Sequence, residues 1–186
     1  MSARERLVES ARELLWERGY VGASPRAIQE RAGAGQGSMY HHFSGKAELA
    51  LEAVRRSAAQ MRVTADAELS GQGTALSRIS TYLLREREVL RGCPIGRLTQ
   101  DPEIIASPRL RQPVEETFAW LRARLAEVIV EGRDEFPAGL DPVATATTIV
   151  AVLQGGYVLA RAADSVEPFD QAINGVLGLL GVPAGR

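Results

Sequence analysis

Apolar residues recur at helical spacing along almost the whole chain. Near the N-terminus, Leu7, Leu14 and Leu15 fall on one helical face, and this stripe ends at Gly19. A glycine suits the left-handed position that follows many helices, so a helix is expected over about residues 3–18. No segment shows a sustained alternation of apolar and polar residues between hairpin turns. The pattern therefore predicts an all-α fold.

Two short helices are expected next. Ser24 can cap a helix whose first position is Pro25, and this helix of about residues 25–32 ends at Gly33. Beyond the glycine-containing turn, a very short helix begins at Gln36. Two short helices joined by such a turn, with another helix packed behind them, form a helix-turn-helix.

The rest of the chain is predicted to form longer helices. Their expected ranges are about residues 45–70, 75–90, 114–131, 142–163 and 169–180, with short helical pieces between the prolines at 102, 108 and 113. The apolar stretch 145–163 is close to the ~20 residues that a membrane span needs. It contains Gln154 and two adjacent glycines, so a buried helix, with no membrane partner, is the preferred interpretation.

Composition and charge distinguish the two ends of the chain. The 186 residues are 45% hydrophobic, which is enough for a real core, and the formal net charge is −1. Residues 1–46 carry seven Lys or Arg against five Asp or Glu, whereas the remainder carries fifteen against eighteen. Contact with phosphate is therefore expected to be local to the N-terminal part.

The cellular location follows from two weaker features. The single cysteine, Cys93, excludes an internal disulfide framework and fits a reducing compartment. The N-terminus is charged from Arg4 onward and has no apolar core of a secretory signal. A cytoplasmic protein is expected. Cys93 could be a redox sensor or a small buried residue, and burial is preferred because the chain has no second cysteine.

The segment 31–46 contains the strongest candidates for functional residues, because its glycine-rich start is followed by a short helix with several polar side chains. Gln36 can hydrogen-bond bidentately to adenine in the major groove, and Ser38 can bond to a base or to a phosphate. Gly37 allows the backbone to approach DNA closely. These residues are therefore predicted to read base edges.

Other polar residues are placed to bind the DNA backbone. Tyr40, His41 and Lys46, which is the only lysine of the chain, can reach phosphates beside the bases that are read. Ser24 and Arg26 lie at the N-terminus of a predicted helix, where free N–H groups and the helix dipole favour a phosphate. Ser24 is also a structural N-cap whether or not DNA is present.

Other chemistries find little support. His41 and His42 point about 100° apart on a helix, and no third histidine or CxxC motif accompanies them, so neither a metal site nor a cofactor is expected. No pair of carboxylates stands out, and Cys93 has no histidine nearby in the sequence. An all-helical enzyme is therefore the least favoured alternative.

The spacing of Gly37, Tyr40, Phe43 and Lys46 is specific. Together with its flanking segments, from about residue 4 to residue 54, it resembles the N-terminal DNA-binding domain of the TetR family of bacterial transcriptional regulators. Tyr40 and Phe43 could both be ordinary core aromatics; Phe43 is expected to point inward, whereas Tyr40, with its hydroxyl, is expected to face the backbone of a nucleic acid.

The resemblance implies two domains. A helix-turn-helix DNA-binding domain is expected at residues 1–46, and an all-helical domain that dimerises and binds a small molecule at residues 47–186. Gly155 and Gly156 would allow another helix to approach closely, as in a four-helix interface between two protomers. A monomeric core is the alternative.

The resemblance also suggests an effector site. Cys93-Pro94 and its flanking arginines resemble a segment in a subgroup of these regulators that respond to planar or lipophilic compounds. Apolar walls with a few polar groups suit such a ligand. The candidate ligand residues are Met61, Cys93, Leu98, Phe118, Leu121, Gln154 and Tyr157.

The implied function is that of a homodimeric repressor. Two recognition helices would read a palindromic operator, and an effector would change their separation through the helix that begins near residue 46. Release of the operator by the ligand is a hypothesis. The alternative within the same fold is a regulator that answers to a protein partner or to no ligand.

Overall fold

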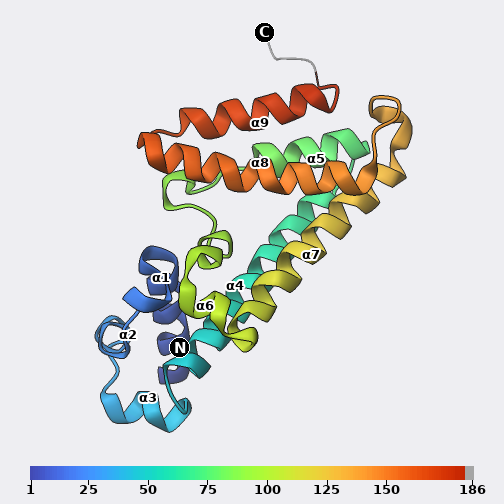
Figure 1. Cartoon of the computed structure of the whole chain (residues 1–186). Helices are drawn as coiled ribbons and strands as arrows, with labels where there is room; N and C mark the ends of the chain where they lie inside the picture. The colour runs from blue at the N-terminus through green and yellow to red at the C-terminus, as the bar shows by residue number, and fades with distance from the viewer. Residues whose placement is uncertain (183–186) are drawn as a thin grey trace. The chain divides into compact units, whose positions relative to one another are not determined.

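The computed structural model describes residues 1–182, apart from the side chain of Gln36, and the chain forms two compact units. Unit 1 comprises residues 1–60 and 93–117, and unit 2 comprises residues 61–92 and the chain from residue 118 onward. All regular structure in the described part of the chain is helical, which confirms the predicted all-α fold (Figure 1).

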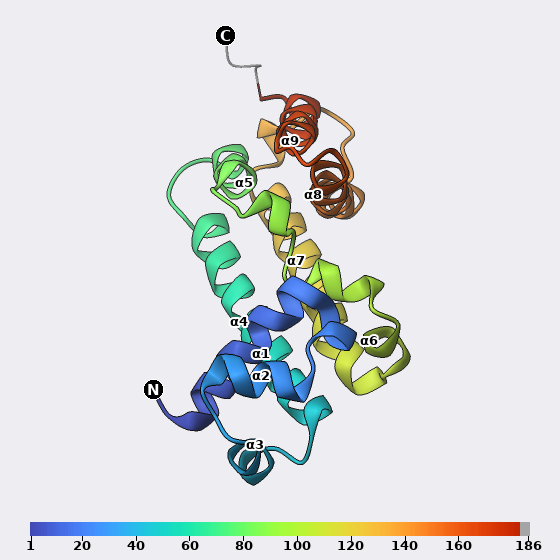
Figure 2. The same cartoon turned by 90° about the vertical axis from the view of Figure 1, so that its left-hand side faces the viewer.

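Unit 1 is built from both of its chain segments. The first segment contributes α1 (Ala3–Gly22), α2 (Pro25–Ala32), α3 (Gln36–His42) and the first part of α4 (Lys46–Leu69). The second contributes η2 (Gly96–Gln100), α6 (Pro102–Ala106) and the first part of α7 (Pro108–Glu131). Helix α1 is the central element, because it contacts α2, α3, η2 and α6; α1 and α2 lie side by side in Figure 2.

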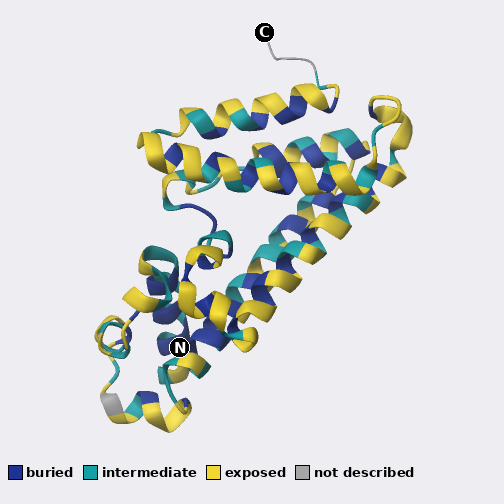
Figure 3. Ribbon diagram, viewed as in Figure 1, coloured by how far each residue is buried: buried dark blue, intermediate teal, exposed yellow. Residues whose placement is uncertain are grey.

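The core of unit 1 follows the apolar stripes of the sequence. Met39 and Phe43 are both buried, as their spacing predicts. They join buried residues from the other helices of this unit: Leu7, Val8, Leu14, Leu15, Ile28, Leu49, Val54, Leu98 and Ile104. The short helix α3 is thus held by one apolar face, while its opposite face stays exposed to solvent (Figure 3).

Unit 2 contains the longer apolar helices. Its elements are the second part of α4, α5 (Ala75–Leu84), η1 (Val89–Arg91), the second part of α7, η3 (Arg133–Glu135), α8 (Pro142–Ala163) and α9 (Glu167–Leu179). Helices α8 and α9 form an antiparallel pair (Figures 1 and 2). Between them Asp164 adopts the left-handed conformation, with φ 49°, and caps α8. A Cβ atom on Gly156 would lie 2.9 Å from the Phe169 ring, so this glycine lets α9 pack closely on α8.

Helix α8 is only partly buried within the chain. It is long and apolar enough to cross a membrane by length and composition, with a mean hydropathy of 1.6, and 33% of its most apolar window is buried. Ile149 and Leu153 face the core of unit 2, whereas Val158 and Leu159 on the other side are 53% and 54% exposed. Within the single chain, α8 is therefore buried on one face and exposed on the other.

Two helix boundaries differ from the prediction. The helix expected over 75–90 ends at Leu84, because the Arg87 guanidinium donates hydrogen bonds to the carbonyls of Tyr82, Leu83 and Arg85 and thereby caps α5. Pro113 was expected to break the chain, yet it lies inside α7. That helix continues because Leu110 and Val114, one turn apart, are both buried on the same face.

The two units do not follow the order of the chain. The predicted domain boundary at residue 46 lies inside unit 1, since this unit includes the first part of α4, up to residue 60. The segment 93–117, which the sequence prediction placed in the second domain, also belongs to unit 1. Helices α4 and α7 each contribute residues to both units.

Candidate nucleic-acid interface and effector site

Helices α2 and α3 form a helix-turn-helix whose turn is set by local sequence. The Ser24 hydroxyl accepts a hydrogen bond of 3.1 Å from the Ala27 N–H and caps α2. At the other end Gly33 adopts φ 58° and ψ 39°, a left-handed conformation that favours glycine. The Ala34 N–H then bonds to the Gln29 carbonyl at 3.0 Å, which turns the chain toward α3.

The two faces of α3 differ in chemistry. The buried Met39 sulfur accepts a hydrogen bond of 3.2 Å from the Gln29 side-chain amide, so the inner face is tied to α2. On the outer face Tyr40 is 53% exposed, and His41 is also exposed. Ser38 is half-buried beside them. The exposed face therefore offers hydroxyl and imidazole groups in the way that contact with phosphate requires.

Gly37 lies on the exposed side of α3 in open space. Among the described residues, apart from its chain neighbours and its own helix backbone, no atom comes within 4 Å of the position that a Cβ atom would occupy, and its φ is not in the left-handed region. Neither packing nor backbone conformation within this chain therefore requires a glycine there. The absence of a side chain leaves room for close approach by a molecule outside the chain.

The residues predicted to contact DNA from the starts of α2 and α3 differ in their surroundings. Ser24 is exposed, and Arg26 is exposed with its Nε 2.8 Å from the Glu30 carboxylate. An exposed i,i+4 pair of this kind is weak, so Arg26 can exchange Glu30 for a phosphate. Gln36 is the first residue of α3, and its side chain lies outside the described residues. Its base-reading role remains a prediction.

Lys46 is less free than the sequence suggests. Its ammonium nitrogen lies 4.2 Å from the centroid of the Tyr20 ring, and the residue is half-buried at the start of α4. Burial lowers the pKa of Lys46 below its ordinary value, while the charges of Asp101 and Glu103 oppose that shift. The aromatic face thus fixes the position of the cation before any phosphate binds.

Asp101 is a structural residue of unit 1 whose role sequence reasoning missed. Its carboxylate accepts hydrogen bonds from the backbone N–H groups of Tyr20 at 2.7 Å and Val21 at 3.3 Å, just after α1 kinks at Gly19 with φ 71°. The other oxygen caps α6. The signal was present as Asp101-Pro102, an N-cap followed by a proline at the first helical position.

The histidine pair does not form part of a larger polar cluster. The rings of His41 and His42 stack edge to face, with centroids 4.9 Å apart. Among the described residues no group of three His, Cys, Asp or Glu side chains is arranged to hold a metal ion.

Two of the predicted effector residues lie in unit 1. Cys93 and Leu98 are both buried there, and the Cys93 sulfur accepts a hydrogen bond of 3.2 Å from the Gly96 N–H, beside the start of η2. This contact gives Cys93 a local structural role in the turn. It is compatible with the interpretation of Cys93 as a small buried residue.

The remaining predicted effector residues lie in unit 2. Leu121 belongs to its buried core, and Phe118 and Tyr157 pack against that core. The Tyr157 ring lies 4.9 Å from the Phe169 ring, while Met61 and Gln154 are half-buried.

The structure also has hollows elsewhere in unit 2. One of about 400 Å³ lies between the end of α5 and α9, and one of about 380 Å³ lies between α7 and α8. None of the seven predicted effector residues lines either hollow. The predicted effector site therefore remains a prediction.

Comparison with known proteins links both chain segments to one family. Residues 7–53 match the family model described as bacterial regulatory proteins, tetR family. Residues 74–176 match the model described as tetracyclin repressor-like, C-terminal domain. The two models together span α1 to most of α9.

Individual relatives agree with this assignment. The chain is 38% identical over 64 residues to the transcriptional repressor AcnR of Corynebacterium efficiens, a match that spans 34% of each chain. It is 24% identical to the repressor NemR of Escherichia coli over 97% of this chain and 95% of NemR. The crystal structure of reduced E. coli NemR is similar, with a TM-score of 0.84 over 98% of this chain and 99% of that one.

A third relative has been solved with DNA. A cysteine mutant of the regulator CifR, complexed with 26-bp double-strand operator DNA, is 24% identical with a TM-score of 0.78, over 95% of each chain. That likeness shows the shared fold. The helix-turn-helix, the helical second unit and the two family matches together lead to one conclusion: the chain belongs to the TetR family of bacterial DNA-binding transcriptional regulators.

Proposed function

We propose that the protein is a cytoplasmic homodimeric repressor, which binds a palindromic operator and is released from it by a small lipophilic or aromatic ligand. The observation that carries the DNA-binding part is the outer face of α3. There an unpacked Gly37 lies in the same short helix as exposed Tyr40 and His41. This face combines close backbone approach with phosphate-binding groups.

The exposed face of α8 and α9 supports the homodimer. Val158 and Leu159 of α8 are more than half exposed, and Leu179 of α9 is 75% exposed. Gly155 faces open space, in contrast to Gly156, which packs against Phe169. Because large apolar side chains exposed along a helix pair indicate an interaction surface, we assign these helices to contact with a second copy of the chain in a two-fold arrangement.

A dimer would also make DNA recognition by the two helix-turn-helix motifs sequence-specific. One short helix contacts only a few base pairs, whereas two heads related by a two-fold axis read half-sites roughly 34–36 Å apart. An effector that binds two conformations of the dimer unequally would then change operator affinity, with a coupling free energy of ~1–3 kcal/mol. Helix α4 begins at Lys46 in unit 1 and continues into unit 2, which makes it the natural carrier of this coupling.

The proposal is tested by operator selection followed by titration. Genomic fragments bound by the purified protein should share a palindrome, and a gel shift on that palindrome should weaken as planar aromatic or lipophilic compounds are added. Stronger binding on addition of a compound would contradict release by the ligand. If no compound changes the shift but a dialysed host extract does, and protease treatment removes that effect, the effector is a protein partner.

A further inference from the structure

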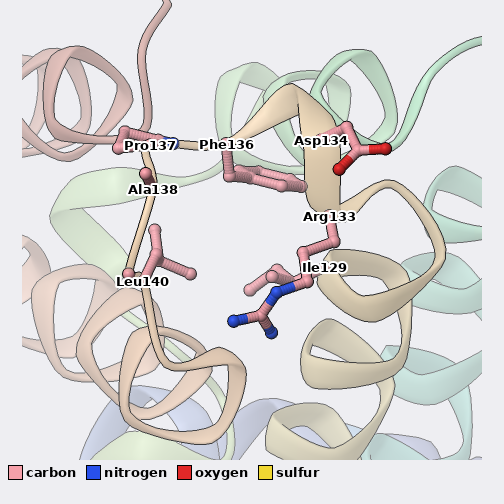
Figure 4. A pocket seen from close by; sticks show the side chains of 8 residues that line it. Ile129, Arg133, Asp134, Phe136, Pro137, Ala138 and Leu140 are labelled. Atoms are coloured by element: carbon pink, nitrogen blue, oxygen red, sulfur yellow. The ribbon is translucent and has the colours of Figure 1, made fainter.

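A hollow of about 380 Å³ lies at the end of α7, away from every residue predicted to bind the effector. It is formed by the last turn of α7, by η3 and by the loop that leads into α8 (Figure 4). All of these elements belong to unit 2. A hollow of this size matches the lower part of the range that small organic ligands occupy, about 300–1,000 Å³.

The hollow opens to solvent, and its walls are apolar on one part and polar on another. Ile129 and Phe136 are buried and contribute their side chains from α7 and from the residue after η3. Pro137 and Leu140 line the opposite side, on the loop before α8. Figure 4 shows these four side chains around the same space. A flat ring or a short branched hydrocarbon would therefore be covered on two sides.

One cation, the exposed Arg133, contributes to the polar part of the lining. Figure 4 shows the Arg133 guanidinium directed across the hollow toward Leu140, whereas the carboxylate of the adjacent Asp134 is turned to the other side of η3. The Arg133 side chain is exposed to solvent and makes no hydrogen bond or ion pair with another described residue. The five N–H donors of this guanidinium are therefore available to a carboxylate, which a planar fork binds in a bidentate manner.

The two sides of the hollow are fixed before any ligand binds. The Glu135 carboxylate accepts hydrogen bonds from the N–H groups of Ala75 at 3.2 Å and Leu76 at 2.8 Å, which ties η3 to the start of α5. On the other side the Asp141 carboxylate caps α8 through the Ala144 N–H at 2.6 Å. A site between two anchored segments loses little conformational entropy on binding.

We propose that this hollow is a binding site for a small apolar carboxylate, with Arg133 holding the carboxylate and the walls around Phe136 covering the hydrocarbon. The charge of Arg133 selects an acid over the neutral amide of the same shape. The site is separate from the seven residues predicted to bind the effector, and it depends on neither the operator nor the dimer.

Benzoate is a suitable probe, with benzamide as its uncharged counterpart. Isothermal titration calorimetry on the full-length protein should detect benzoate binding, and benzamide should bind roughly tenfold more weakly because it lacks the ionic contact. Arg133→Gln should weaken benzoate by a similar factor. Arg122→Gln, an exposed arginine on α7 outside the hollow, should leave benzoate affinity unchanged.

A second variant tests the apolar walls without removing the charge. Ala138→Phe places a ring at the edge of the hollow, where Ala138 is exposed, and should abolish benzoate binding while the unfolding temperature stays the same. The proposal is overturned if wild-type protein does not bind benzoate, or if Arg133→Gln and Arg122→Gln bind it equally. A gel shift on the same preparations reports operator binding separately, so failure of this site and failure of the proposed repressor function are distinguishable.

Discussion

The Asp101 carboxylate accepts a hydrogen bond of 2.7 Å from the backbone N–H of Tyr20, across 81 residues of sequence. The same oxygen lies 3.0 Å from the position of a Cβ atom on Gly19, so a side chain there would press against it. The carboxylate therefore stabilises the end of α1 and the start of α6 at once. It links the helix-turn-helix to the chain segment that carries Cys93.

Replacement of Asp101 should destabilise unit 1. In Asp101→Asn one carboxylate oxygen becomes an NH₂ donor, which leaves partly buried backbone N–H groups without an acceptor, and the loss is expected to be about 1–3 kcal/mol. Urea denaturation measures it. Asp134→Asn, at an exposed carboxylate, is the control and should change the free energy of unfolding by less than about 0.5 kcal/mol. Equal stability of the two variants would contradict the role of Asp101.

Gly37→Ala should separate stability from function. Since nothing in the chain occupies the Cβ position, alanine should stabilise α3 by about 0.5–1 kcal/mol, yet the added methyl group should obstruct contact with DNA and lower operator affinity. Thermal unfolding and fluorescence anisotropy with labelled operator measure the two effects on the same sample. Unchanged affinity would show that Gly37 is not at the DNA surface.

Lys46→Met tests a phosphate contact without removing the packing on Tyr20. The unbranched methionine keeps the hydrocarbon over the ring, so the fold should persist, while affinity should fall for all DNA sequences alike. The slope of log affinity against log salt should drop by about 0.9 for each protomer. Gln36→Ala is the contrast, since it should relax preference at one base pair. A salt slope unaffected by Lys46→Met would exclude the phosphate contact.

Charge on the outer face of α8 should dissociate the protein. Val158→Glu introduces a carboxylate into the proposed interface and should shift the mass measured by light scattering from dimer to monomer. Operator affinity should fall with it. Val130→Glu provides the matched control, because Val130 is similarly exposed but lies on α7. Dimers that persist in Val158→Glu would place the interface elsewhere.

Stability in acid should depend on Glu135. Hydrogen bonding from the Leu76 N–H lowers the pKa of Glu135 below its ordinary value. A carboxylate with a depressed pKa adds stability that is present above its unfolded pKa and is lost as the pH falls through its folded pKa. Glu135→Gln should therefore lose stability near neutral pH and show a flatter decline below about pH 4.5, compared with the exposed Glu115→Gln. Parallel acid-unfolding curves would contradict this.

Local patterns predicted most of the helices and the faces of α3. Met39 and Phe43 are four residues apart and both are buried, because a short helix has only one apolar stripe with which to pack. Ser24 and Gly33 likewise predicted the two ends of α2 from capping chemistry alone. These features depend on residues within one helical turn, so the sequence contains all the information that they need.

Contacts between residues far apart in the sequence could not be predicted from local patterns. Nothing local indicates that Arg87 turns back to cap α5, or that Asp101 binds the end of α1. The pair Gly155-Gly156 was read as one feature, yet Gly156 packs on Phe169 while Gly155 faces open space. The hollow around Arg133 is lined by residues of α7, of η3 and of the following loop. The sequence does not predict it, because the path of that loop back toward α7 depends on the folded structure.

Unit 1 is built from two separate chain segments, so the DNA-binding helices can complete their packing only after the second segment has been synthesised. Residues 1–60 leave the ribosome first, but their partners in 93–117 follow only several seconds later at about 5–20 residues per second. Until then the N–H groups of Tyr20 and Val21 lack the Asp101 carboxylate. For the same reason, a chimeric regulator assembled by exchanging heads at residue 46 would join α1 to a foreign α6, whereas a graft that carries residues 93–117 along would preserve the native contact.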